Sequence, residues 1–110
     1  MSRPLLSPAA AGLMRALAFR LGRQSQRMRL TDCRSVDWQS LTFTGQRHRI
    51  DLIIAGPDGE RWAQRLVEGL EEAELNLPGR FVADITIASP ILPRPDGSAE
   101  LAIEALTIQD

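Results

Sequence analysis

The chain has 110 residues, of which 44% are hydrophobic and 25% charged, and its net charge is −1. These values are typical of one globular domain; they exclude a disordered chain and leave no room for two domains. The single cysteine excludes an internal disulfide and a cysteine-based zinc site, which favours a reducing, cytoplasmic setting. All thirteen basic residues are arginine, a bias typical of GC-rich bacterial genomes.

Charge is divided unevenly along the chain. Residues 1–34 hold seven arginines and one acid, whereas residues 35–110 hold six arginines and thirteen acids. We therefore expect a basic N-terminal helical arm over residues 1–34 and an acidic α/β body over residues 35–110, within a single domain overall. Opposite charges on one chain have to be satisfied within the molecule, between copies, or by a partner.

The first predicted element is an amphipathic helix that begins near residue 8. Ser7 is a suitable N-cap and Pro8 a suitable first helical residue. One side of this helix is apolar, with residues recurring at steps of three and four: Ala10, Leu13, Met14, Leu17 and Leu21. The uncharged run in this region is too short to span a bilayer, so a membrane partner is not expected.

A β-hairpin is predicted over residues 36–55. Gly45-Gln46 suits a tight two-residue turn, which would pair Phe43 with His48. One face of that hairpin would then be apolar and would carry Leu41, Phe43, Ile50, Leu52 and Ile54.

A second helix is predicted from about Gly59 to Glu74, with Asp58 as its N-cap. Its buried stripe is expected to consist of Trp62, Leu66, Val67, Leu70 and Ala73. The last turn of this helix is acidic, which opposes the helix dipole, so we expect an arginine of the arm to lie nearby. Two further strands follow, over residues 80–89 and 98–108. A shift of phase in the last strand indicates a β-bulge or a strand end covered on both faces.

The predicted fold class is thus α+β with the order α-β-β-α-β-β. We expect a two-layer sandwich in which a four-stranded mixed sheet carries one helix on one face, plus the N-terminal amphipathic helix. This order is similar to that of small α/β RNA-binding modules. The chain lacks, however, the glycine-lysine loop of KH domains and the aromatic platform of RNA-recognition motifs.

No set of residues specifies a reaction, so the chain is not expected to be an enzyme, and no catalytic residue, cofactor or metal ligand is predicted. His48 is the only histidine and is expected to pack at the hairpin end, because no companion nucleophile is visible. Cys33 is expected to be a small, partly buried residue in a connector. The glutamates of residues 68–74 are expected to form a solvated or arginine-paired face rather than a metal site.

The candidate interaction residues lie in the arm, and they are Arg15, Phe19, Arg20, Arg23 and Arg27. We predict a protein that acts through protein–protein contacts, as a homodimer or with another protein, because the acidic body repels nucleic acid and anionic lipid. A nucleic-acid-binding module that uses these residues is the first alternative. A small-molecule or enzyme site near His48 is the second alternative.

Overall fold

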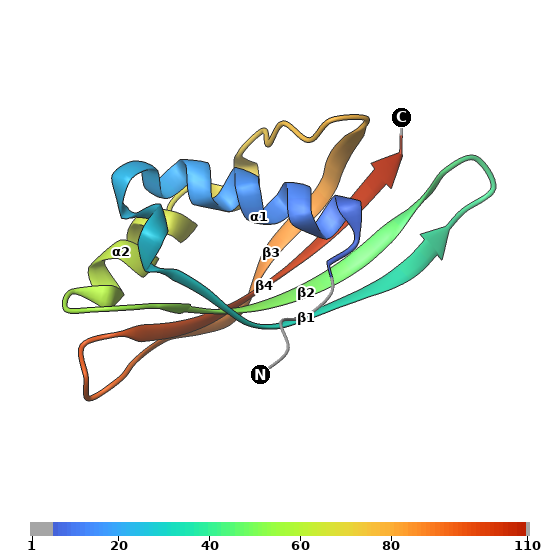
Figure 1. The fold of residues 1–110 in the computed structure, drawn as a ribbon. Helices are drawn as coiled ribbons and strands as arrows, with labels where there is room; N and C mark the ends of the chain where they lie inside the picture. Colours follow the sequence, from blue (N-terminus) through green and yellow to red (C-terminus); the bar gives the residue numbers. More distant parts are fainter. Residues whose placement is uncertain (1–5, 110) are drawn as a thin grey trace.

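The computed structural model describes residues 6–109, and its elements follow the predicted order α-β-β-α-β-β. The helices and strands are α1 (Pro8–Leu21), η1 (Gly22–Arg27), β1 (Met28–Gln39), β2 (Thr44–Ile54), α2 (Gly59–Val67), η2 (Leu70–Glu72), β3 (Arg80–Pro93) and β4 (Ala99–Gln109), where η marks a 3-10 helix. Figure 1 shows two layers, with both α-helices on the same face of one open sheet. The predicted α+β class is confirmed.

The sheet has the strand order β1-β2-β4-β3, and each neighbouring pair is antiparallel. The sheet is therefore antiparallel throughout, whereas a mixed sheet was predicted from the sequence. The reason is the short turn between β3 and β4, in which the N–H of Arg94 donates to the carbonyl of Ser98 at 2.8 Å. This turn folds β4 back into the space between β2 and β3, so those two strands run in the same direction without pairing.

The turn of the first hairpin precedes Gly45 instead of containing it, so the predicted turn at Gly45-Gln46 is wrong. Gly45 lies inside β2 opposite Trp38, and the turn is closed by the N–H of Ser40, which donates to the carbonyl of Phe43 at 2.9 Å. A Cβ on Gly45 would lie 1.9 Å from the carbonyl oxygen of Thr107, so glycine is needed here for close approach between strands. Two side chains predicted on the core face are exposed as a result: Leu41 and Phe43.

The second helix is shorter than predicted. It ends at Val67, and Gly69, with a φ of 70°, separates it from the short turn η2. Asp58 precedes the helix with a φ of 64°, and its side chain makes no capping hydrogen bond. Trp62 is only half-buried, because it lies at the edge of the helix–sheet contact, where the guanidinium of Arg27 sits 5.9 Å from its ring centre.

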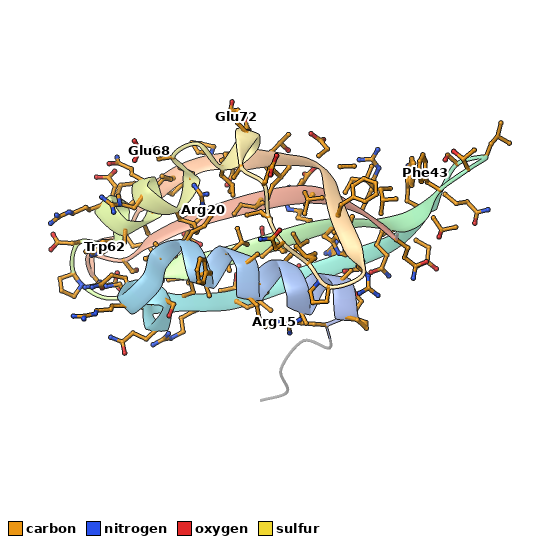
Figure 2. The ribbon with its side chains drawn as sticks, turned by 90° about the horizontal axis from the view of Figure 1, so that it is seen from above. Arg15, Arg20, Phe43, Trp62, Glu68 and Glu72 are labelled. Carbon is orange, nitrogen blue, oxygen red and sulfur yellow. The ribbon has the colours of Figure 1, made fainter. Side chains whose placement is uncertain are left out.

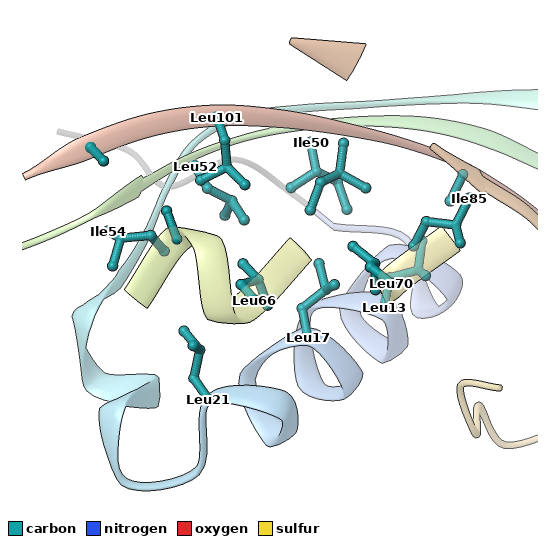
Figure 3. Close-up of a cluster of buried hydrophobic side chains, with 14 of the residues drawn as sticks. Leu13, Leu17, Leu21, Ile50, Leu52, Ile54, Leu66, Leu70, Ile85 and Leu101 are labelled. Atoms are coloured by element: carbon teal, nitrogen blue, oxygen red, sulfur yellow. The ribbon is translucent and has the colours of Figure 1, made fainter. Parts of the chain in front are cut away.

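The core lies between the sheet and the two helices (Figure 3). Its largest fully buried apolar side chains come from both layers and are Leu13, Leu17, Ile50, Leu52, Ile54, Leu66, Leu70 and Ile103. The N-terminal helix therefore contributes core side chains rather than standing apart from the body. The boundary that the charge distribution suggested, after residue 34, falls inside β1.

The central strand β4 accounts for the shift of phase seen in the last strand. Its register against β2 is continuous from Ala99 to Ile108, so it contains no bulge in that pairing. Thr107 is buried on the inner face that carries the helices, and Leu106 and Ile108 are buried on the outer face. The register shifts lie instead in the edge strands β1 and β3. Within residues 6–109, no helix is long and apolar enough to cross a membrane.

Candidate interaction surface

The helix α1 is fixed at its start by its own sequence. The hydroxyl of Ser7 accepts a hydrogen bond from the N–H of Ala10 at 3.1 Å, and Pro8 occupies the first helical position, as predicted. One side of the helix is packed into the core through Leu13, Leu17 and Leu21. The opposite side is therefore held in a defined position on the surface.

Arg20 joins α1 to the end of α2. Its Nε donates to the carbonyl oxygen of Leu66 at 3.0 Å, and a terminal nitrogen donates to the carbonyl oxygen of Glu68. These carbonyls belong to the last turn of α2, where a helix lacks internal donors and carries partial negative charge. An arginine of the arm thus lies at the end of α2, as expected, but the predicted acidic last turn is wrong, because α2 ends at Val67 and its last turn carries Arg65 instead of glutamates. The guanidinium is bound by backbone carbonyls rather than by the glutamate carboxylates.

Arg27 has a similar internal role at the other end of α2. One of its terminal nitrogens donates to the carbonyls of Ala55 and Pro57, at 2.9 and 2.7 Å, in the loop that precedes α2. Its Nε donates to the side-chain oxygen of Gln24. Two of the four arginines predicted for interaction thus satisfy backbone groups of the fold.

Of the remaining candidates, Arg15 and Phe19 lie on the outward side of α1, Arg23 lies in η1, and all three side chains are exposed. Phe19 is 88% exposed, an unusual value for an aromatic side chain on a well-anchored helix. Figure 2 shows Arg15 on the side of α1 that faces away from α2, whereas Arg20 points toward α2. Arg15 and Phe19 form what we call the outward face of α1.

A groove of about 650 Å³ runs along the outward face of α1. One wall is formed by α1 and the other by the segment that leads into β3; its lining residues are Arg15, Ala16, Phe19, Arg20, Glu74, Leu75 and Asn76. The groove thus combines a cation, an anion and apolar side chains within one short stretch of surface.

His48 is buried and fully satisfied. Its exposed fraction is 2%, Nδ1 lies 2.7 Å from the hydroxyl of Ser35, and Nε2 lies 2.8 Å from the hydroxyl of Thr107. Burial, and to a lesser extent the positive charge of Arg80, lowers the pKa of His48 below its ordinary value of 6.5. A neutral imidazole between two hydroxyls is a stable buried arrangement. The predicted contact with Phe43 is replaced by this polar one, because the hairpin register differs.

The other residues considered for chemistry lack supporting geometry. Burial raises the pKa of the Cys33 thiol, which opposes a reactive thiolate. Among the described residues, no group of three or more histidine, cysteine, aspartate or glutamate side chains is placed to hold a metal ion. Glu71 has a structural contact instead, because its carboxylate accepts a hydrogen bond from the N–H of Ile87 at 2.9 Å.

A second polar region, which was not predicted from the sequence, lies where the strands project beyond α1. Every second residue of β2 near the hairpin turn is polar, in the series Thr44, Gln46 and His48, before the same face becomes apolar from Ile50 onward. This alternation of polar residues is the sequence pattern that could have revealed the polar region. The wrong turn position placed Thr44 on the opposite face and hid the pattern.

Comparisons with known proteins add no family to these observations. No protein-family description, no curated protein and no solved structure matches the chain.

Proposed function

We propose that this protein acts through protein–protein contacts and that it self-associates through the outward face of α1. The observation that carries this proposal is the 88% exposure of Phe19 on a helix whose other side is locked into the core. Burying a phenylalanine side chain contributes about 1.5–3 kcal/mol, so a fixed and exposed one is a strong candidate for an interface anchor.

The chemistry of the groove favours a second copy of the chain as the partner. A twofold interface brings the same patch of both copies together, so the patch has to be complementary to itself. Arg15 and Glu74 line the same groove and form no ion pair with each other within the described residues. In a twofold arrangement, Arg15 of one copy faces Glu74 of the other, while Phe19 packs against Leu75.

The nucleic-acid alternative has weaker support. It required the arginines of the arm to contact phosphates together, but Arg20 and Arg27 donate to carbonyls of the fold. Arg15 and Arg23 are then the exposed cations of that set. Each neutralised phosphate contributes separately to affinity, so two cations give weak and strongly salt-dependent binding.

Sedimentation equilibrium over a range of protein concentrations tests the proposal. We expect the wild-type chain to associate reversibly and Phe19→Ser to weaken association at least tenfold. Leu92→Ser is the matched control, because Leu92 is also an exposed apolar side chain, at 53%, but lies on β3 away from the groove. A wild-type chain that stays monomeric at every concentration contradicts the proposal.

Charge reversal tests the proposed contact between Arg15 of one copy and Glu74 of the other. Arg15→Glu and Glu74→Arg should each weaken self-association through like-charge repulsion, and the double variant should restore it, because the pair then has its charges exchanged. Association that survives Phe19→Ser and both charge reversals would place the interface elsewhere. Binding of a labelled RNA or DNA pool at low salt by the wild type, lost in Arg15→Glu, would favour the nucleic-acid alternative.

A further inference from the structure

The sheet is longer than the helical layer that covers it (Figure 1). The uncovered part of its inner face contains a cavity of about 290 Å³. The N-terminus of α1 forms one wall and the four strands form the floor. The lining residues are Ser7, Pro8, Ala9, Asp37, Trp38, Gln39, Thr44, Gly45, Gln46, Arg80, Thr107 and Gln109. This size is at the lower limit of ordinary ligand sites, so it suits a small metabolite rather than a nucleotide.

The cavity floor is ordered by a chain of hydrogen bonds. The hydroxyl of Ser7 donates to the side-chain oxygen of Gln46 at 2.7 Å, and the amide nitrogen of Gln46 donates to Asp37 at 3.3 Å. These two bonds fix the orientation of the Gln46 amide. They also hold the Asp37 carboxylate at the cavity while leaving most of its acceptor capacity free.

A cation lies on the opposite side of the floor. Arg80 begins β3, whereas Asp37 belongs to β1, and the strands β2 and β4 separate them. Three strand intervals, about 14 Å, and an offset of two residues along the strands, about 7 Å, separate the two backbones by about 16 Å. The long Arg80 side chain spans part of that distance, and its charge is near enough to the inner face to lower the pKa of His48. Within residues 6–109, Arg80 forms no ion pair with a carboxylate.

The charges decide which ligand class fits. A simple anion attracted to Arg80 is repelled by Asp37, and a simple cation attracted to Asp37 is repelled by Arg80. A molecule that carries both a carboxylate and an ammonium, a few bonds apart, satisfies both side chains at once. The α1 N-terminus is not needed as an anion site, since Ser7 already caps it.

We propose that this cavity binds a small zwitterion of the amino-acid class, with the ligand carboxylate on Arg80, the ligand ammonium on Asp37, and the intervening chain over Gln46 and Thr107. The cavity is distinct from the groove along the outward face of α1, because the two share no lining residue. This site therefore stands independently of self-association.

Titration of the isotope-labelled chain, followed by amide NMR shifts, tests the site. The probes are glycine, β-alanine, 4-aminobutanoate and 5-aminopentanoate, in which the two charges are progressively further apart. We expect saturable shifts at Gln46, Thr107 and Gln109, with the tightest binding for one length of the series. Acetate and methylamine, each carrying one of the two charges, should bind at least tenfold more weakly than that best probe.

Substitutions at the two charged residues complete the test. Arg80→Gln and Asp37→Asn should each weaken binding of the best probe at least tenfold. Arg94→Gln changes an exposed arginine just after the end of β3 and should leave binding unchanged. Spectra of both variants without ligand report whether each still folds. Folded variants that bind as tightly as the wild type overturn the proposal, as does the absence of shifts with every amino acid. Tighter acetate binding in Asp37→Asn than any zwitterion shows in the wild type would also overturn it.

The Phe19→Ser variant separates this proposal from the proposed function. It should bind the best probe as the wild type does, because Phe19 lies outside the cavity. Loss of ligand binding in that variant would show that the cavity depends on self-association, which contradicts an independent site.

Discussion

The two ends of the inner sheet face differ sharply, although the same strands build both. Under the helices, the inward residues of β2 are Ile50, Leu52 and Ile54, each at most 1% exposed. Beyond the start of α1, the corresponding residues are Thr44 and Gln46, and these line a cavity. The comparison indicates that helical cover, rather than the strand itself, decides which residue type occupies an inward position. The covered end provides buried apolar contacts, and the projecting end is where we propose ligand binding.

Removal of a covered side chain should have the largest effect. Leu17 lies on the inward side of α1 and is fully buried, so Leu17→Ala should lower the free energy of unfolding by about 2–5 kcal/mol. Urea unfolding measures this loss. Phe19→Ala, two residues along on the exposed side, should change the free energy by less than about 0.5 kcal/mol when both chains are measured below the concentration at which they associate. Equal losses in both variants would mean that α1 is not oriented as described.

Much of the covered end could be predicted from the sequence. The helical spacing of Leu13, Leu17 and Leu21 identified the buried side of α1, and the alternation from Ile50 to Ile54 identified the buried face of β2. These patterns are informative because a core position tolerates only apolar side chains. The same reasoning placed Ser7 and Pro8 correctly at the start of α1, because capping depends on local chemistry alone.

The projecting end could not be predicted in the same way. Gly45 resembled a turn residue, but it is needed because the backbone of β4 approaches too closely for a Cβ. That constraint comes from a strand about sixty residues later in the chain, so local sequence does not reveal it. Likewise, the charge pattern could place an arginine near the end of α2 but could not show which arginines bind carbonyls and which stay exposed.

The border between the two ends is occupied by His48, and its replacement should have an intermediate effect. His48→Leu removes the partner of the Thr107 hydroxyl, which is only 1% exposed. The Thr107 hydroxyl then keeps only its long hydrogen bond to the carbonyl of Gln46, at 3.5 Å, and a buried hydroxyl that loses its good partner costs about 1–3 kcal/mol. Urea unfolding of His48→Leu at neutral pH should show a loss in this range. A more stable variant would indicate that the apolar covered end extends past this row of residues.

Titration of His48 should also make the free energy of unfolding depend on pH. The pKa of His48 is lower in the folded chain than its ordinary value of 6.5, so below that value the unfolded chain binds a proton that the folded chain does not. The stabilising contribution is therefore present above pH 6.5 and is lost as the pH falls toward the lowered pKa. Unfolding free energies of the wild type should decrease between about pH 7.5 and 5.5. His48→Leu should show a smaller decrease, and an identical slope in both chains would argue against a buried neutral imidazole.

A small loss of stability is expected at the projecting end, where the comparison can be tested most directly. Gln46→Ala removes the hydrogen bonds to Ser7 and Asp37, but water can replace them in an open cavity, so the loss should stay below about 1 kcal/mol. Binding of the best amino-acid probe should nevertheless weaken, because Gln46 holds Asp37 in place. Thr42→Ala, in the exposed hairpin turn, is the control for a nearby polar truncation outside the cavity. If Gln46→Ala destabilised the chain as much as Leu17→Ala, the projecting end would belong to the core, and the division between a stabilising end and a binding end would fail.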